Sequence, residues 1–118
     1  MTRPRFQLVP GARFAGWAGG GVGWRLLGPN NRELGRSAGP YGDAERALAA
    51  IARARETVHS GAAHVLQHRD TALWAWQLED SGVVTATSGR GFRHEQECRY
   101  NLEQFRAAAP TAPVSHHA

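Results

Sequence analysis

The sequence predicts an α+β protein made of two tandem β-β-β-α repeats, with an antiparallel sheet and two helices packed on one of its faces. Residues of the first half return in the second at a fixed distance: Ser37 and Ser88 lie 51 positions apart, and so do Tyr41 and Phe92. Each half also runs through short alternating segments, a turn, a glycine break and an amphipathic segment. Self-similarity at a fixed period is typical of a duplicated structural unit.

The first half contains three expected strands. Polar and apolar residues alternate over residues 5–9 and again over 22–27, as a half-buried strand requires. The stretch GPNN at 28–31 has the residues of a tight turn, and a third strand follows at about 32–37. Six glycines at 11–23 predict a loop. It is not a phosphate-binding loop, because no Lys follows residues 19–23 and a strand stands where a helix should begin.

A helix follows in each half. Asp43 is a good N-cap, and the first helix is expected to run from it to about residues 59–61, with apolar residues at helical spacing at Ala47 and Ile51. The second helix is expected at about 94–107, with Cys98 on its core-facing side. The second half places its three strands at 63–69, 73–79 and 83–88.

The domain organisation follows from these elements. We expect one domain over residues 1–107, divided into repeats at about 5–58 and 63–107, and a disordered Pro- and Ala-rich tail over 108–118. Each half is too small to bury a stable core, so neither should fold by itself. A monomer is favoured over a homodimer.

The repeated motif resembles a known family. An aromatic-x-aromatic strand, an Asn-Gly-like turn, a short strand ending in Ser, an aromatic residue and a helix are similar to the YegP-like family of small bacterial and archaeal domains. The matching stretches are 24–51 and 74–102, and Trp74-Ala75-Trp76 stands where that family has Trp-Arg-Trp. The resemblance implies two β-β-β-α units, antiparallel sheet and helices packed on it. It implies no established activity.

Composition restricts the functional classes. The chain has 118 residues, 42% hydrophobic and 20% charged, with a formal net charge of +4. A single cysteine excludes a disulfide framework and a cysteine-based zinc site. The N-terminal residues have no secretory signal pattern, and no apolar run is long enough to span a membrane. We therefore expect a cytoplasmic protein without a cofactor.

Arginines and tryptophans suggest one possible binding surface. All 14 basic residues are Arg, a side chain suited to phosphate. Tryptophan stacking on bases, with phosphate contacts from Arg25, Arg36, Arg90 and Arg93, would make a weak nucleic-acid binder. The alternative is that the Trp face is the core. Leu26 and Leu78 lie in phase with Trp24 and Trp76 and favour that alternative.

The other reactive residues do not indicate catalysis. Cys98 and His94 are four apart on a helix, yet Cys98 occupies a core position. His64 and His68 share a strand face without a third metal ligand, and His116 and His117 lie in the tail. The favoured function is a non-catalytic interaction module, regulatory or stress-related, with a protein partner. A weak nucleic-acid binder is the alternative, and an enzyme is the least favoured reading.

Overall fold

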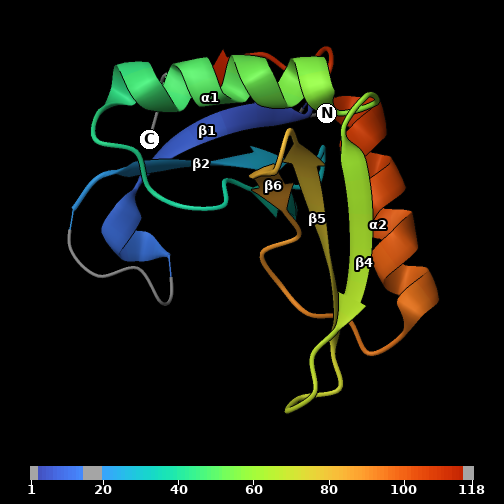
Figure 1. Ribbon diagram of the computed structural model, residues 1–118. Coiled ribbons are helices and arrows are strands. Elements are labelled where there is room, and N and C mark those ends of the chain that lie inside the picture. The colour runs from blue at the N-terminus through green and yellow to red at the C-terminus, as the bar shows by residue number, and fades with distance from the viewer. Residues whose placement is uncertain (1–2, 15–19, 116–118) are drawn as a thin grey trace.

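The computed structural model describes residues 3–14 and 20–115. They form an α+β fold in which two helices pack on a seven-stranded mixed sheet (Figure 1). The elements are, in chain order, β1 (Arg5–Pro10), the short 3-10 helix η1 (Gly11–Arg13), β2 (Val22–Leu27), β3 (Glu33–Arg36), α1 (Ala44–Thr57), β4 (Ala62–Gln67), β5 (Trp74–Asp80), β6 (Val83–Thr87), α2 (Glu95–Ala108) and β7 (Val114–Ser115).

Most of the expected elements lie within one or two residues of their predicted bounds. The Asp43 side chain accepts a hydrogen bond from the backbone N–H of Arg46 at 2.9 Å, so the predicted N-cap of α1 is confirmed. Phe14 is buried after η1 and fixes the start of the glycine-rich segment to the rest of the fold. Residues 15–19 of that segment lie outside the described residues.

The expectation of a purely antiparallel sheet is wrong at one edge. The strand order is β4-β5-β6-β3-β2-β1-β7, and all neighbours are antiparallel except β1 and β7. After α2 the chain returns along β1 in the same direction, and Phe6 N donates to Pro113 O at 2.8 Å. A sheet edge presents unpaired backbone groups, and this return satisfies some of them on β1.

The expectation of a disordered tail is also wrong for residues 108–115. Helix α2 extends to Ala108, and the two following apolar residues, Ala109 and Ala112, are 0% and 3% exposed. The Arg55 guanidinium donates a hydrogen bond to the Ala112 carbonyl. Composition suggested disorder because alanine and proline give no clear hydrophobic pattern, yet both alanine side chains are buried here. Residues 116–118 lie outside the described part of the chain.

A single core lies between the sheet and both helices. Trp24 and Trp76 are fully buried, which confirms that the Trp face is the core. Phe105 of α2 contacts both indoles, with ring centroids 6.3 Å from Trp24 and 5.0 Å from Trp76. Helix α1 packs on β1, β2 and β6, while α2 packs on β3, β4 and β5. Each helix therefore joins strands of both halves.

The sheet turns sharply at its centre. Figure 1 shows β1 and β2 crossing beneath α1, whereas β4 and β5 run in a very different direction alongside α2. The halves meet where β3 pairs with β6, and the register there is the single pair Arg36 and Thr87. Because β3 and β6 share so short a pairing, the strands of the first half, β1 to β3, can twist relative to those of the second half, β4 to β6. The turn opens space between α2 and the β2–β3 connection.

Candidate functional site

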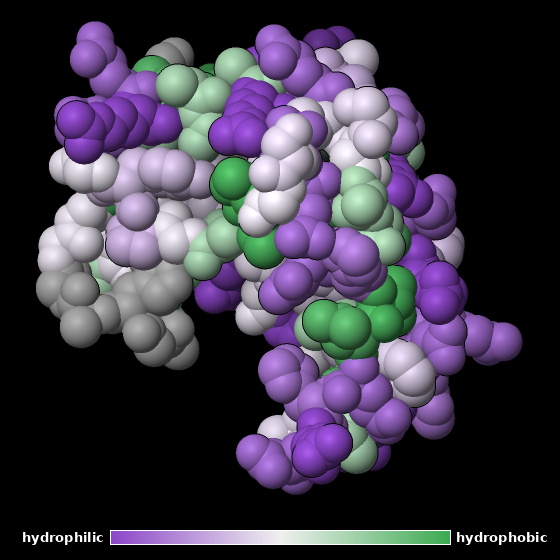
Figure 2. All heavy atoms as spheres, in the orientation of Figure 1, coloured by the Kyte–Doolittle hydropathy of each residue, from purple (hydrophilic) through white to green (hydrophobic). Residues whose placement is uncertain are grey.

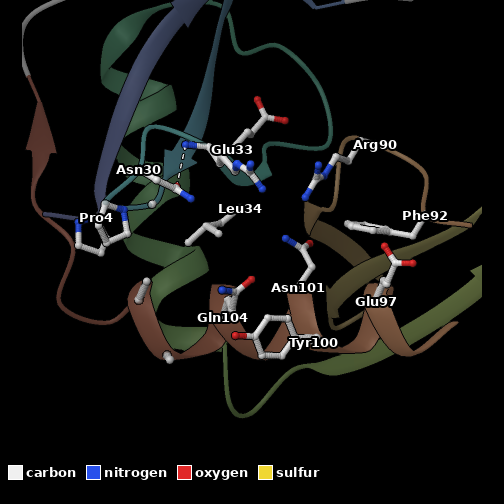
Figure 3. Close-up of a pocket in the computed structure, with 15 residues that line it drawn as sticks. Pro4, Asn30, Glu33, Leu34, Arg90, Phe92, Glu97, Tyr100, Asn101 and Gln104 are labelled. Carbon is white, nitrogen blue, oxygen red and sulfur yellow. Dashed lines mark hydrogen bonds between the residues drawn. The ribbon is translucent and has the colours of Figure 1, made fainter. Parts of the chain in front are cut away.

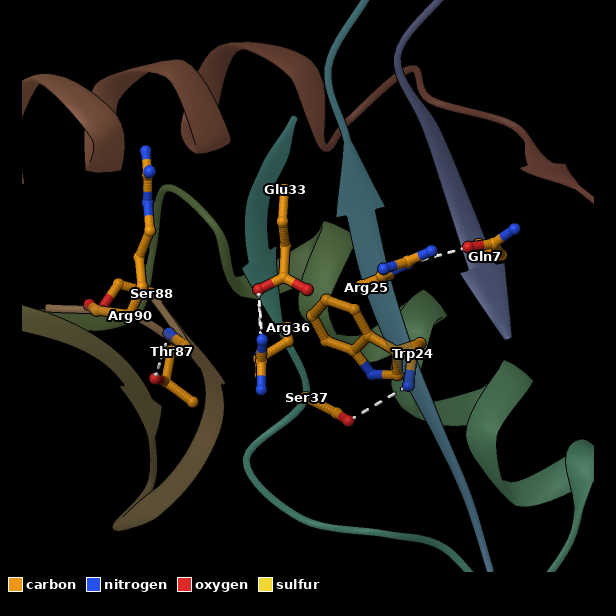
Figure 4. Close-up of polar contacts among 10 residues, drawn as sticks. Gln7, Trp24, Arg25, Glu33, Arg36, Ser37, Thr87, Ser88 and Arg90 are labelled. Carbon is orange, nitrogen blue, oxygen red and sulfur yellow. Dashed lines mark hydrogen bonds and ion pairs between the residues drawn. The ribbon is translucent and has the colours of Figure 1, made fainter. Parts of the chain in front are cut away.

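The four arginines named from the sequence lie in different surroundings. Arg25 and Arg36 are directly opposite each other on β2 and β3, on the sheet face away from the helices. Arg25 Nε donates to Gln7 Oε1 at 2.8 Å, and Arg36 is ion-paired with Glu33 at 2.7 Å (Figure 4). Both guanidinium groups are thus engaged by side chains of the protein itself, which reduces their availability for phosphate.

Arg90 and Arg93 follow β6. The Arg90 guanidinium lies over the Phe92 ring, 4.7 Å from its centroid. Arg93 is exposed, and no ion pair or hydrogen bond to any described residue holds its side chain. Arg90 is the one of the four that lines a cavity of appreciable size.

The open sheet face carries a row of polar residues. Directly opposed residues on six successive strands form it: Gln7, Arg25, Arg36, Thr87, Gln77 and His64. His64 also contacts Glu79 at 2.6 Å. Glu33 pairs with Arg36 and Glu79 with His64, and the other members of the row apart from Arg25 are neutral. This face is therefore not an electropositive trough of the kind that tracks a nucleic-acid backbone.

The reactive residues are not assembled into a catalytic group within the described part of the chain. Cys98 is 0% exposed, and burial raises the pKa of its thiol, so the reactive thiolate is disfavoured. His94 is at the N-cap of α2 and points toward Glu97 at 3.9 Å, largely in solvent. No cluster of three or more metal-ligating side chains occurs among the described residues. His116 and His117 lie outside them.

A groove of about 690 Å³ lies between α2 and the β2–β3 connection. Helix α2 contributes residues spaced three and four apart, which therefore share one face. Figure 3 shows these side chains below the groove, with Leu34 and Arg90 on the opposite side. The residues that line it are Pro4, Gly28, Pro29, Asn30, Arg32, Glu33, Leu34, Arg90, Phe92, Glu97, Tyr100, Asn101, Gln104, Ala107 and Ala108.

Asn101 is the central polar side chain of this groove, and it is only 3% exposed. Its Oδ1 accepts a hydrogen bond from Trp76 Nε1 at 2.6 Å. Because an indole N–H can only donate, this bond fixes which end of the amide is oxygen. Asn101 Nδ2 is buried and has no hydrogen-bond partner among the described residues. A buried donor without an acceptor costs about 1–3 kcal/mol, so its retention calls for an explanation.

The charges around Asn101 are unequal. Glu33 is neutralised by its ion pair with Arg36. Arg32 and Arg90 have no carboxylate partner among the described residues, and Glu97 has only the distant His94. Tyr100, 67% exposed, stands at the rim. The groove therefore combines an apolar wall, one buried neutral donor and a small excess of positive charge.

The first half has a corresponding but smaller groove, of about 250 Å³. Tyr41, Ala49, Ala50 and Arg53 line it at the positions equivalent to Phe92, Tyr100, Asn101 and Gln104, together with residues 83–85 of β6. Ala50 has no acceptor to offer, and Trp24 Nε1, the equivalent of Trp76 Nε1, is buried without a hydrogen-bond partner among the described residues. The Trp24 indole N–H lies near the Tyr41 hydroxyl without forming a hydrogen bond of good geometry; it lowers the pKa of Tyr41, against the larger rise caused by burial.

Asn101 was missed because a polar residue in a helix normally predicts a solvated face. The available signal was the comparison of halves. Position 101 lies between the core positions Cys98 and Leu102, and its equivalent in the first half is Ala50. An asparagine at a core-facing position where the first half has alanine indicates that the two halves differ chemically at this point.

Comparison with known proteins identifies the fold. No protein-family model matches the chain, and no curated protein matches its sequence. The solution NMR structure of YegP from E. coli, a protein of unknown function, matches with a TM-score of 0.76 at 13% identity, over 98% of this chain and 93% of that one. The UPF0339 protein SO3888 from Shewanella oneidensis matches with a TM-score of 0.76 at 10% identity, over 98% and 97%. The resemblance read from the sequence is confirmed at the level of the fold. Among the described residues, neither helix has the length and hydrophobicity needed to cross a bilayer.

Proposed function

We propose that this protein is a non-catalytic interaction module that binds a segment of a partner protein in the groove between α2 and the β2–β3 connection. The observation that carries the proposal is Asn101, whose buried Nδ2 lacks an acceptor that a bound ligand would supply. The groove is concave and partly apolar with few polar groups, as binding sites usually are. A regulatory or stress-related role stays a prediction from the sequence.

We further propose that the two halves are tandem repeats that have diverged at this groove. The order β-β-β-α occurs twice, and equivalent bonds recur: the Ser37 and Ser88 hydroxyls accept from the backbone N–H of Trp24 and Trp76, at 3.1 and 3.3 Å. The isolated bridges of Val22 with Tyr41 and of Trp74 with Phe92 are likewise equivalent. One copy then kept a small groove while the other acquired Asn101 and a larger one.

The test is selection of peptides followed by mapping. A displayed library of random hexapeptides is selected against the full chain, and enriched peptides are titrated into isotope-labelled protein by NMR. We expect the amide signals of residues 28–34, 90–92 and 97–108 to shift, and those of the small groove around Ala50 to stay in place. Enriched peptides that shift only other regions, or a selection without enrichment, would contradict the proposal.

The nucleic-acid alternative is less well supported. Trp24 and Trp76 have no exposed surface on which bases could stack, and Arg25 and Arg36 are paired within the protein. Its test is titration with a single-stranded oligonucleotide at low salt, where backbone contacts are strongest. We expect no binding there. Tight, salt-sensitive binding that Arg25→Gln weakens would favour this alternative over the peptide module.

A further inference from the structure

We infer that the groove recognises an acidic extended peptide, with a main-chain carbonyl oxygen on Asn101 Nδ2 and a carboxylate against Arg90. This inference rests on the proposed function and specifies the ligand of the same groove. Its first support is chemical: Nδ2 can only donate, so its missing partner is an oxygen acceptor. A peptide carbonyl is the commonest such group in a protein partner.

The length of the groove suits an extended segment. Its α2 wall runs from Glu97 to Ala108. At a rise of ~1.5 Å per helical residue, this wall is about 16 Å long. An extended chain advances ~3.3 Å per residue, so the wall accommodates about five residues. Because side chains of an extended peptide alternate, those on one side would face the apolar wall at Leu34 and Ala108 while the others reach the rim.

The charge distribution favours an acidic partner. Arg32 and Arg90 line the groove without a carboxylate partner among the described residues, and Glu33 is paired with Arg36. Glu97 is the remaining carboxylate of the lining, so the two arginines exceed it by one positive charge. Figure 3 shows the Arg90 side chain directed toward the same space as Asn101. The Phe92 ring under its guanidinium restricts that side chain, so less conformational entropy is lost when it binds a carboxylate. The net charge of +4 acts in the same direction over longer distances.

The experiment compares two probes on the full chain. One is an acetylated hexapeptide amide of alternating leucine and aspartate, and the other replaces each aspartate by asparagine. NMR titration follows the Asn101 side-chain NH₂ signals and the Trp76 indole N–H. We expect the aspartate peptide to bind at least about tenfold more tightly and to shift the Asn101 signals, because charge-assisted hydrogen bonds exceed neutral ones.

Matched variants separate the specific contact from overall charge. Arg90→Gln should weaken the aspartate peptide about tenfold, whereas Arg93→Gln, which removes the same charge three residues away, should change its affinity less than twofold. Asn101→Asp keeps an acceptor for Trp76 but removes the donor, and should weaken both probes, because both offer the main-chain carbonyl that Nδ2 would bind. The thermal unfolding midpoint and the Trp76 indole signal establish that each variant is folded.

The outcomes distinguish this inference from the proposed function. Equal affinity for both probes, or equal effects of Arg90→Gln and Arg93→Gln, would overturn the acidic ligand while leaving a peptide groove intact. A library that enriches only neutral or basic peptides bound at residues 97–108 would do the same. If neither probe shifts the Asn101 signals, the inference is wrong, and library selection then decides whether the groove binds peptide at all.

Discussion

The difference between Asn101 and Ala50 is a difference of one hydrogen bond in two otherwise similar places. Trp76 and Trp24 are both fully buried, but only the Trp76 indole N–H has a hydrogen-bond acceptor among the described residues. In the second half Asn101 accepts that N–H at 2.6 Å, and in the first half a methyl group cannot. The stability of the protein should therefore respond in opposite directions to substitutions at the two positions.

The first prediction concerns this pair. Asn101→Ala should lower the free energy of unfolding by about 1 kcal/mol: it breaks the hydrogen bond to Trp76 and leaves that indole N–H unpaired, while removal of the unpaired Nδ2 offsets part of the loss. Ala50→Asn should raise it by about 1 kcal/mol, because the small groove has room for an amide that pairs with Trp24. Urea denaturation measures both. A loss of stability in Ala50→Asn as large as that in Asn101→Ala would show that the positions are not equivalent.

Gly35 provides a second prediction at the level of single residues. A Cβ there would lie 2.6 Å from Phe105 Cδ2 and 2.9 Å from Trp76 Cη2, closer than carbon atoms pack. The Phe105 ring cannot move away easily, because it lies between the two indoles. Gly35→Ala should cost about 1–3 kcal/mol of stability, measured by urea denaturation.

The control for this substitution is Gly39→Ala, where a Cβ would meet nothing within 4 Å and a change within about 0.5 kcal/mol is expected. Adding Phe105→Leu to Gly35→Ala should cost less than the two single changes together, because the smaller side chain makes room for the new methyl group. Strict additivity of the two would argue against a steric cause.

Among the elements, β7 is the one held in place mainly by contacts with other parts of the chain. Two residues pair in parallel with β1, and what holds them is their surroundings: the bonds from Phe6 N to Pro113 O and from Arg55 to Ala112 O, and the burial of Ala112. Residues 109–115 thus cover part of the core beside β1 and lengthen the sheet at an edge where unpaired backbone would otherwise face solvent.

Removal of this segment tests its contribution. A chain that ends at Pro110 should lose about 1–3 kcal/mol of stability, because Ala112 and the partly buried Val114 no longer cover the core. Ala112→Asp in the full chain should be destabilising to a similar or larger extent, since it places a charge at a site that is 3% exposed. Denaturation midpoints of both variants equal to that of the parent would show that the segment is not part of the folded domain.

At the scale of the whole molecule, the two halves depend on each other. Phe105 of the second half packs on Trp24 of the first, and α1 of the first half contacts β6 of the second. The backbone seam between them is a single registered pair. The association of the halves therefore depends on side-chain packing, with the hydrogen bonds of the sheet playing a small part.

Separated halves should consequently be unfolded. Peptides of residues 1–60 and 61–118 are each expected to give the circular dichroism of disordered chains, with tryptophan emission typical of indoles in water. Mixed in equal amounts, they should recover the spectra of the intact chain, because the shared core is then complete. Cooperative thermal unfolding of either half alone would contradict this expectation and would show that the core is divisible.

The sequence by itself determined what depends on local periodicity. Alternation over 22–27 and 73–79 placed Trp24 and Trp76 on one face, and Asp43 predicted the start of α1. The spacing of 51 paired Ser37 with Ser88, and each of these hydroxyls accepts from a tryptophan backbone N–H. Each of these follows from a side-chain pattern within a few residues of the chain. The backbone geometry of a strand or helix fixes which of its side chains share a face.

Only the tertiary structure decided the groove, the parallel strand β7 and the turn of the sheet. The groove joins Pro4, the β2–β3 connection, the loop after β6 and one face of α2, which are far apart in the sequence. Asn101 is a candidate binding residue only because its Oδ1 accepts from the Trp76 indole N–H, which leaves its Nδ2 without an acceptor beside the groove. Long-range packing sets these distances, and no local pattern of residues contains them.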